Sequence, residues 1–149
     1  MSMTDALELA WLAHYFTNTA IANVGDASGL QPAATVGSLY ISLHTADPGE
    51  TGSQNTNETT FTNYVRVAVP RNVTNWTTSG TSPTQVANAL AITFAQCGAS
   101  GATLTHFGIG FSSSGAGTLH FSGALTSSLA VSNGVTPSFA ISALVVTQD

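Results

Sequence analysis

The stretch SLYISLHTADPGETG, residues 38–52, contains both a strand pattern and the turn that ends it. Leu39, Ile41 and Leu43 alternate with polar positions, which is typical of a β-strand with one buried face. The ADPGE that follows places proline and glycine where a tight turn requires them. The stretch therefore predicts a half-buried strand that ends at His44 and runs into a turn.

The same stretch brings one histidine and two acids close together in sequence: His44, Asp47 and Glu50. Side chains of these types are metal ligands in many proteins, so a metal site is one interpretation. However, there is no second histidine nearby, and an Asp-Pro pair commonly initiates a turn. We interpret the three residues as a turn and expect no metal or other cofactor.

Further apolar and alternating segments recur along the chain, separated by clusters of Gly, Ser, Asn and Pro such as TTSGTSP, residues 77–83. Many short strands with turn signals between them predict a mainly β fold, an antiparallel β-sandwich or jelly-roll-like domain. The strands expected after the first turn cover residues 64–70, 87–95, 103–111, 117–125 and 137–148.

The N-terminal segment predicts a short α-helix within residues 1–22. Thr4 is a suitable N-cap, and two acids follow in the first turn, where they interact favourably with the helix dipole. A helix of about 14 residues is marginal alone, so its apolar face must dock on its own domain or on a neighbouring subunit. Its apolar stripe comprises Leu7, Trp11 and Tyr15, widened by Leu9, Leu12 and Phe16.

The length of 149 residues is ordinary for one domain, and we expect a single domain over residues 1–149. A Gly/Pro/Ala/Asp-rich connector, residues 23–37, separates the helix from the predicted β-sandwich, residues 38–149. The long polar segment 47–62 is expected to be a loop.

Charged residues are unusually rare, at 6% of the chain with a net charge of −5, against about 25% in typical soluble domains. Nucleic acid is not an expected partner, because a duplex binder needs several basic contacts to phosphates. Membrane association is not expected either, since there is no basic patch, no apolar run near 18 residues and no signal-peptide pattern. A neutral surface with little charge repulsion instead favours a protein that works in an assembly.

The only basic side chains apart from histidine are Arg66 and Arg71, and the chain contains no lysine. Each guanidinium is therefore expected to serve several acceptors. We interpret Arg66 as structural, holding loop carbonyls or a carboxylate such as Asp47 in a bidentate pair. Contact with a partner protein is the alternative.

No catalytic pattern is present, and we expect the protein not to be an enzyme. His106 and His120 could meet across a strand pair and bind zinc, but polar partners at a sheet surface are the preferred interpretation. The glycine-rich GIGFSSSGAG, residues 108–117, has no lysine and no following helix, so it predicts a hairpin and not a phosphate loop. Cys97 is expected to be a small buried side chain.

Five motifs in this order resemble a family of small tailed-bacteriophage virion proteins: AHYFTNTA, LYISLHTADPGETG, NYVRVAV, ITFAQCGASGATLTHFGIGFSSSGAGTLHFSGAL and VSNGVTPSFAISALVVTQD. The resemblance covers nearly the whole chain. Members are often labelled tail-fibre-like, and some look like capsid decoration (cement) proteins. The resemblance implies a structural role without catalysis.

Within that family, we expect a capsid decoration protein that binds the outer surface of the head shell and stabilises it. A fibre shaft should show repeats or a coiled-coil heptad, and the chain shows neither. The expected partners are the major capsid protein and copies of itself, as a homo-oligomeric dimer or trimer on the virion head. The alternative is a component of the tail, tail fibre or baseplate that contacts the host surface.

The contacts with partners are expected on the helix face and on the polar loop 55–62. If the protein binds sugars on a host, Trp76 is the strongest candidate, because an exposed indole stacks on sugar rings. The predicted contact residues are Leu7, Trp11, Tyr15, Asn55, Asn57, Glu58, Arg66, Arg71 and Trp76.

Overall fold

The computed structural model describes residues 3–80 and 83–148, and its fold is mainly β with one short N-terminal helix. This confirms the predicted fold class, whereas the jelly-roll arrangement stays a prediction. The chain divides into two compact units, each built from separate segments. The single domain over residues 1–149 stays a prediction. The first unit comprises Met1–Gly37, Pro70–Ala91 and Phe139–Asp149, and the second comprises Ser38–Val69 and Ile92–Ser138.

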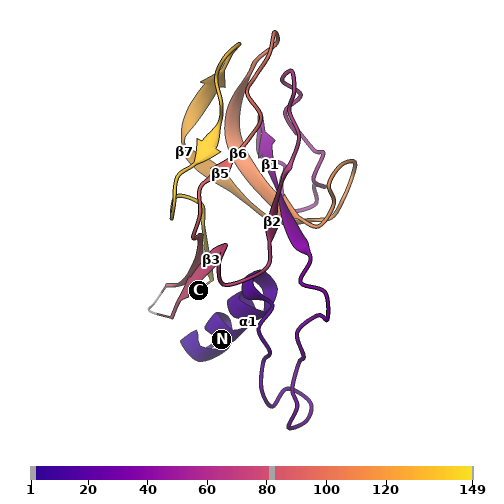
Figure 1. The fold of residues 1–149 in the computed structure, drawn as a ribbon, viewed down its shortest axis with the longest axis vertical. Coiled ribbons are helices and arrows are strands. Elements are labelled where there is room, and N and C mark those ends of the chain that lie inside the picture. Colours follow the sequence, from indigo (N-terminus) through magenta and orange to yellow (C-terminus); the bar gives the residue numbers. More distant parts are fainter. Residues whose placement is uncertain (1–2, 81–82, 149) are drawn as a thin grey trace. The chain divides into compact units, whose positions relative to one another are not determined.

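The second unit is built around a four-stranded sheet with the order β2-β1-β6-β7 (Figure 1). The pairs β1–β6 and β6–β7 are antiparallel. Apolar side chains from β1 and β6, among them Ile41 and Ile109, are fully buried and form the core of this unit. The strands are β1 (Ser38–His44), β2 (Val67–Pro70), β6 (Ala102–Gly110) and β7 (Leu119–Val131).

Strand β1 differs from its prediction because its polar face is also buried toward its end. Ser42 and His44, expected to face water, are both completely inaccessible. Gly108 of β6 lies opposite Ser42 and leaves room for both side chains. A Cβ atom at Gly108 would lie 2.6 Å from Ser42 Oγ and 2.7 Å from His44 Nε2. The missing side chain on β6 therefore allows polar groups to enter the interior.

Two short strands, β5 (Ile92–Thr93) and β8 (Ser138–Phe139), form a separate two-stranded sheet. Within the second unit the pairing continues through backbone bonds from Phe94 N–H to Pro137 O and from Cys97 N–H to Val135 O. The side chain of Cys97 is buried, as the sequence predicted.

The first unit contains helix α1 and a three-stranded antiparallel sheet of order β3-β4-β9. Helix α1 packs on β3 and β4, and Leu12 and Phe16 are its buried apolar side chains. The ring of Phe16 meets that of Trp76 edge-on, with 4.8 Å between centroids. The elements are α1 (Asp5–Thr17), β3 (Trp76–Ser79), β4 (Thr84–Asn88) and β9 (Val145–Gln148).

Helix α1 begins directly after Thr4, the predicted N-cap, and its C-terminal end is set by Asn18. The chain enters the helix at Thr4, whose carbonyl accepts the first backbone bonds, although its hydroxyl makes no capping bond. The helix ends where Asn18 adopts a left-handed conformation with φ 54°. The Asn18 carboxamide then exchanges two hydrogen bonds with the backbone of Ala33 in the connector. One side chain therefore terminates the helix and anchors the segment after it.

Several strand boundaries differ from the prediction. Residues 64–70 contain only the four-residue β2, and residues 87–95 contain the end of β4 and the two-residue β5. The segment 77–83, expected to be a turn, contributes to β3, and its residues 81 and 82 lie outside the described part of the chain. Within residues 3–80 and 83–148, no helix has the length and apolar character needed to cross a membrane.

Candidate functional site

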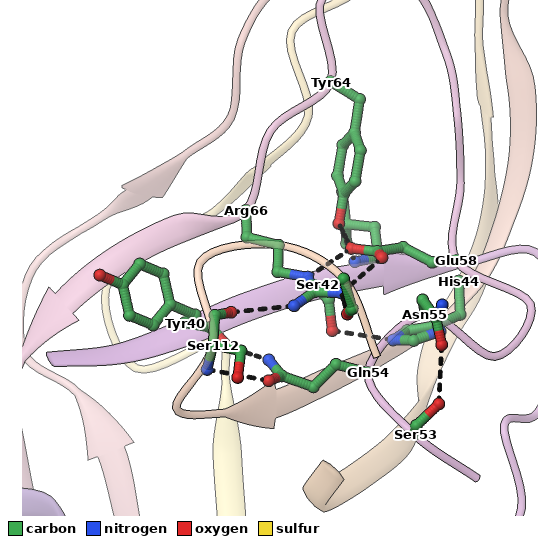
Figure 2. Close-up of polar contacts among 12 residues, drawn as sticks. Tyr40, Ser42, His44, Ser53, Gln54, Asn55, Glu58, Tyr64, Arg66 and Ser112 are labelled. Atoms are coloured by element: carbon green, nitrogen blue, oxygen red, sulfur yellow. Dashed lines mark hydrogen bonds and ion pairs between the residues drawn. The ribbon is translucent and has the colours of Figure 1, made fainter. Parts of the chain in front are cut away.

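The centre of the candidate site is a buried ion pair between Arg66 and Glu58 in the second unit (Figure 2). Arg66 Nε donates to Glu58 Oε1 and Nη2 donates to Glu58 Oε2, both at 2.7 Å. The two side chains are only 2% and 14% exposed. These hydrogen bonds raise the pKa of Arg66. The acid in the bidentate pair is therefore Glu58, and the predicted partner Asp47 was wrong.

Arg66 also holds the segment that connects β6 and β7, residues 111–118, which we call the hairpin tip. Its Nη1 donates to Ser112 O at 2.9 Å, and its Nη2 donates to Gly115 O at 2.6 Å. A single guanidinium thus joins the loop that carries Glu58 to the hairpin tip. The structural interpretation of Arg66, holding loop carbonyls and a carboxylate, is confirmed by these contacts.

Tyr64 connects the same ion pair to strand β1. Its hydroxyl donates to Glu58 Oε1 at 2.8 Å and accepts the Leu43 N–H at 3.0 Å. Burial raises the pKa of the Tyr64 hydroxyl, so the phenol keeps its proton and remains a donor. The Glu58 carboxylate is consequently held by three side-chain donor bonds, two from Arg66 and one from Tyr64.

Gln54 is a second fully buried connection to the hairpin tip, and sequence reasoning missed it. Its Oε1 accepts the Ser112 N–H at 3.0 Å, and its backbone N–H donates to Gly117 O at 2.7 Å. Cβ atoms at Gly110 and Gly117 would collide with the Gln54 side chain. Gly110 and Gly117 thus leave room for a glutamine from a different loop, a pairing that no local sequence signal shows.

His44 is buried, and both of its ring nitrogens form hydrogen bonds. Its Nδ1 donates to the carbonyl of Thr56 at 2.8 Å, which leaves Nε2 to accept the Ser42 hydroxyl at 2.8 Å. Burial lowers the pKa of His44. Asp47 instead accepts the Gly49 N–H at 2.9 Å, which is the predicted turn. Among the described residues, no group of three or more His, Cys, Asp or Glu is placed to hold a metal ion.

The two histidines of the β6 and β7 segments do not face each other. In the strand register, His106 is opposite His44 on one side and Ala124 on the other. His120 instead meets the ring of Phe111 edge-on at 4.9 Å. The suggested pairing of His106 with His120 is therefore wrong.

Helix α1 presents only part of its predicted stripe to the outside. Leu7 and Trp11 are 38% and 41% exposed, whereas Tyr15 is half-buried beneath the guanidinium of Arg71, 5.9 Å from its ring centroid. Arg71 also donates to the carbonyls of His14 and Tyr15, at 2.8 and 2.5 Å. These are free carbonyls of the last helical turn, so Arg71 caps the helix.

Trp76 is the clearest correction among the predicted contact residues. Its side chain is only 1% exposed, and its indole N–H donates to Pro70 O at 3.1 Å. It packs on Phe16 in the core of the first unit, so it has no face on which a sugar could stack. The predicted role of Trp76 as an exposed stacking platform was wrong, because its indole packs in the core of the first unit.

The two predicted asparagines do lie on the surface. Asn55 is exposed, and its Oδ1 accepts the Ser53 hydroxyl at 2.7 Å. Asn57 is exposed with a φ of 55°, and its carboxamide donates to the carbonyl of Asp47 at 2.9 Å. Both side chains therefore support the loop locally, and their predicted role in partner contact stays a prediction.

Residues 58–66 and the hairpin tip together border a hollow of about 490 Å³. The ion pair of Arg66 and Glu58 contributes to its wall, and most other lining side chains carry hydroxyl, amide or apolar groups. The lining residues are Glu58, Thr59, Thr60, Phe61, Thr62, Asn63, Tyr64, Val65, Arg66, Ser113, Ser114 and Gly115.

Comparison with known proteins gives one family for this chain. A family model described as podophage GP4 fiber I protein gp80 matches residues 2–147. No curated protein matches the sequence. The family match confirms the resemblance to virion proteins of tailed phages and identifies the protein as a structural component of a phage particle. With almost its full length matched, the chain belongs to the family of the podophage GP4 fiber I protein gp80.

Proposed function

We propose that this protein is a non-enzymatic component of a tail fibre, and that it contributes a rigid contact surface to the fibre. The observation that carries this proposal is the family match over residues 2–147, because the family description names a fibre protein. That description favours the alternative function over the capsid decoration role that the sequence analysis preferred.

The structure supports a contact role more than a shaft role. The chain has no repeat or heptad that would build an elongated shaft. Instead, the second unit holds two surface loops in fixed positions through Arg66, Glu58 and Gln54. A surface that is already ordered loses less entropy when it binds, which favours a loop region used for contact.

The proposed partners follow from this position. As part of a fibre, the protein would bind copies of itself and other tail proteins, and the major capsid protein would not be a partner. The exposed side chains of Leu7 and Trp11 on α1 are the apolar groups we assign to these contacts within the virion.

Copy number tests the proposal directly. In purified particles, quantitative mass spectrometry of this protein should give a small fraction of the copy number of the major capsid protein. Shell decoration requires copies in proportion to the shell subunits. A copy number comparable to that of the major capsid protein would contradict the fibre assignment.

A further inference from the structure

We infer that the hollow between residues 58–66 and the hairpin tip binds a neutral saccharide. This inference rests on the proposed fibre function, since it gives that contact surface a ligand class. The volume of about 490 Å³ lies within the range of about 300–1,000 Å³ typical of small-molecule sites. Every lining residue belongs to the second unit.

The electrostatics of the lining disfavour an anionic ligand. Glu58 and Arg66 neutralise each other through two hydrogen bonds, and the side chain of Arg66 is almost completely buried. Tyr64 stays protonated because burial raises its pKa. A phosphate or carboxylate would therefore need a cation that is already paired, and desolvating such an anion without a partner is costly. A neutral ligand meets no such penalty.

The polar groups of the lining match the hydroxyl groups of a sugar. Thr60, Ser113 and Ser114 are exposed, and each hydroxyl donates one hydrogen bond and accepts others. Asn63 adds a carboxamide whose Nδ2 donates to Gln96 O at 3.3 Å. Sugar hydroxyls have the same dual character, so each could pair with such a group in either direction.

Apolar surface lies beside these hydroxyls. Val65 is 61% exposed and gives the lining an aliphatic surface, whereas Phe61 is only 3% exposed and its ring packs edge-on against Tyr64, with 5.2 Å between their centroids. A sugar ring carries C–H groups on its faces and hydroxyls around its edge. A site that combines the aliphatic carbon of Val65 with neutral hydroxyls complements both parts of such a ligand.

The walls of the hollow are fixed in the absence of a ligand. The carbonyl of Gly115 is held by Arg66, and the backbone N–H of Thr62 donates to Ser100 O at 2.9 Å. Asn63 adopts a left-handed conformation with φ 76°, which asparagine tolerates better than most residues. A sugar could therefore bind without first ordering the loop, which lowers the entropic cost of binding.

Saturation-transfer difference NMR on the full chain tests this inference with defined probes. The probes are glucose, galactose, rhamnose and N-acetylglucosamine, with glucuronate as the anionic comparison. We expect saturation transfer to at least one neutral sugar and weaker transfer to glucuronate. Ser113→Trp, which fills the hollow, should reduce the transfer at least tenfold. The matched control Ser127→Trp, at an exposed position of β7 outside the hollow, should retain it.

A second pair of variants covers the case in which the tryptophan disturbs the fold. Thr60→Val replaces a lining hydroxyl with a methyl group of the same shape and should weaken the transfer. Thr126→Val makes the same change at an exposed position on β7 and should not weaken it.

Absence of transfer to all four neutral sugars, a preference for glucuronate, or equal loss in lining and control variants would overturn the inference. If the copy number in the particle fits a tail fibre but none of these sugars binds, only the inference is refuted. A copy number near that of the shell subunits would refute the fibre function.

Discussion

Glu58 is the residue on which the loops of the second unit depend, because its carboxylate accepts two bonds from Arg66 and one from Tyr64. Replacing Glu58 with Gln leaves the Arg66 charge buried without its counterion. Breaking a buried ion pair in this way costs about 3–5 kcal/mol. Urea unfolding should therefore show a loss of this size for Glu58→Gln. Glu50→Gln makes the same chemical change at an exposed acid and should alter stability by less than about 0.5 kcal/mol.

Gly108 provides a second residue-scale test, because a Cβ there would meet Ser42 and His44 below 3 Å. Gly108→Ala should lower the free energy of unfolding by about 1–3 kcal/mol, as expected for overpacking in a tight interior. Ser122→Ala, at an exposed position of the neighbouring strand β7, should be near neutral. A stable Gly108→Ala variant would show that the buried polar face of β1 can relax.

The lowered pKa of His44 predicts how the free energy of unfolding depends on pH. Burial lowers the pKa of His44 in the folded state. As the pH falls below about 6.5, His44 therefore becomes protonated in the unfolded chain at a higher pH than in the folded protein. The stabilisation is complete above that pH and is lost as the pH falls toward the folded pKa. In urea unfolding between pH 7.5 and 5.5, His44→Gln should show a smaller fall than the native protein. His120 also has a lowered pKa, so His120→Gln measures its separate share.

The site shows which residue roles a sequence can reveal. The scarcity of basic residues correctly predicted that Arg66 serves several acceptors. Its carboxylate partner could not be chosen in advance, because Asp47 and Glu58 lie in the same polar loop and only the path of the chain decides. Gln54 was missed since a neutral polar side chain in a polar loop carries no signal of burial.

At the scale of single elements, Arg71 is the cap of helix α1. Arg71→Ala removes its bonds to the last-turn carbonyls of His14 and Tyr15. Hydrogen bonds to charged groups contribute about 1.5–3 kcal/mol, so the C-terminal turn of α1 should open more readily. Amide hydrogen exchange should be faster in α1 and unchanged in β6, which belongs to the other unit. Unchanged exchange throughout α1 would contradict the capping role.

Some elements could be predicted from sequence patterns, and others could not. Strand β1 and helix α1 were found because apolar side chains recur at strand and helix spacing. Strands β3 and β4 were missed, since β4 buries Thr84, Val86 and Asn88, of which only one is apolar. Asn88 can be buried because its carboxamide binds the backbone at residues 90, 140 and 144. Two of those partners, at residues 140 and 144, are distant in sequence, so a local pattern does not show them.

At the scale of the whole molecule, the few basic side chains form internal contacts. Both arginines of the chain are used internally, one in the hairpin tip network and one at the helix cap. The surface is consequently left with neutral polar groups and a few exposed acids such as Asp47 and Glu50. Binding to other virion proteins should therefore depend little on salt, because few ion pairs are available for screening.

The most direct test of the fibre assignment is a cryo-EM density map of the intact particle. The account predicts that density matching the four-stranded sheet and its hairpin tip lies in a fibre attached to the tail. Density for this protein spread across the outer surface of the head shell would contradict the account.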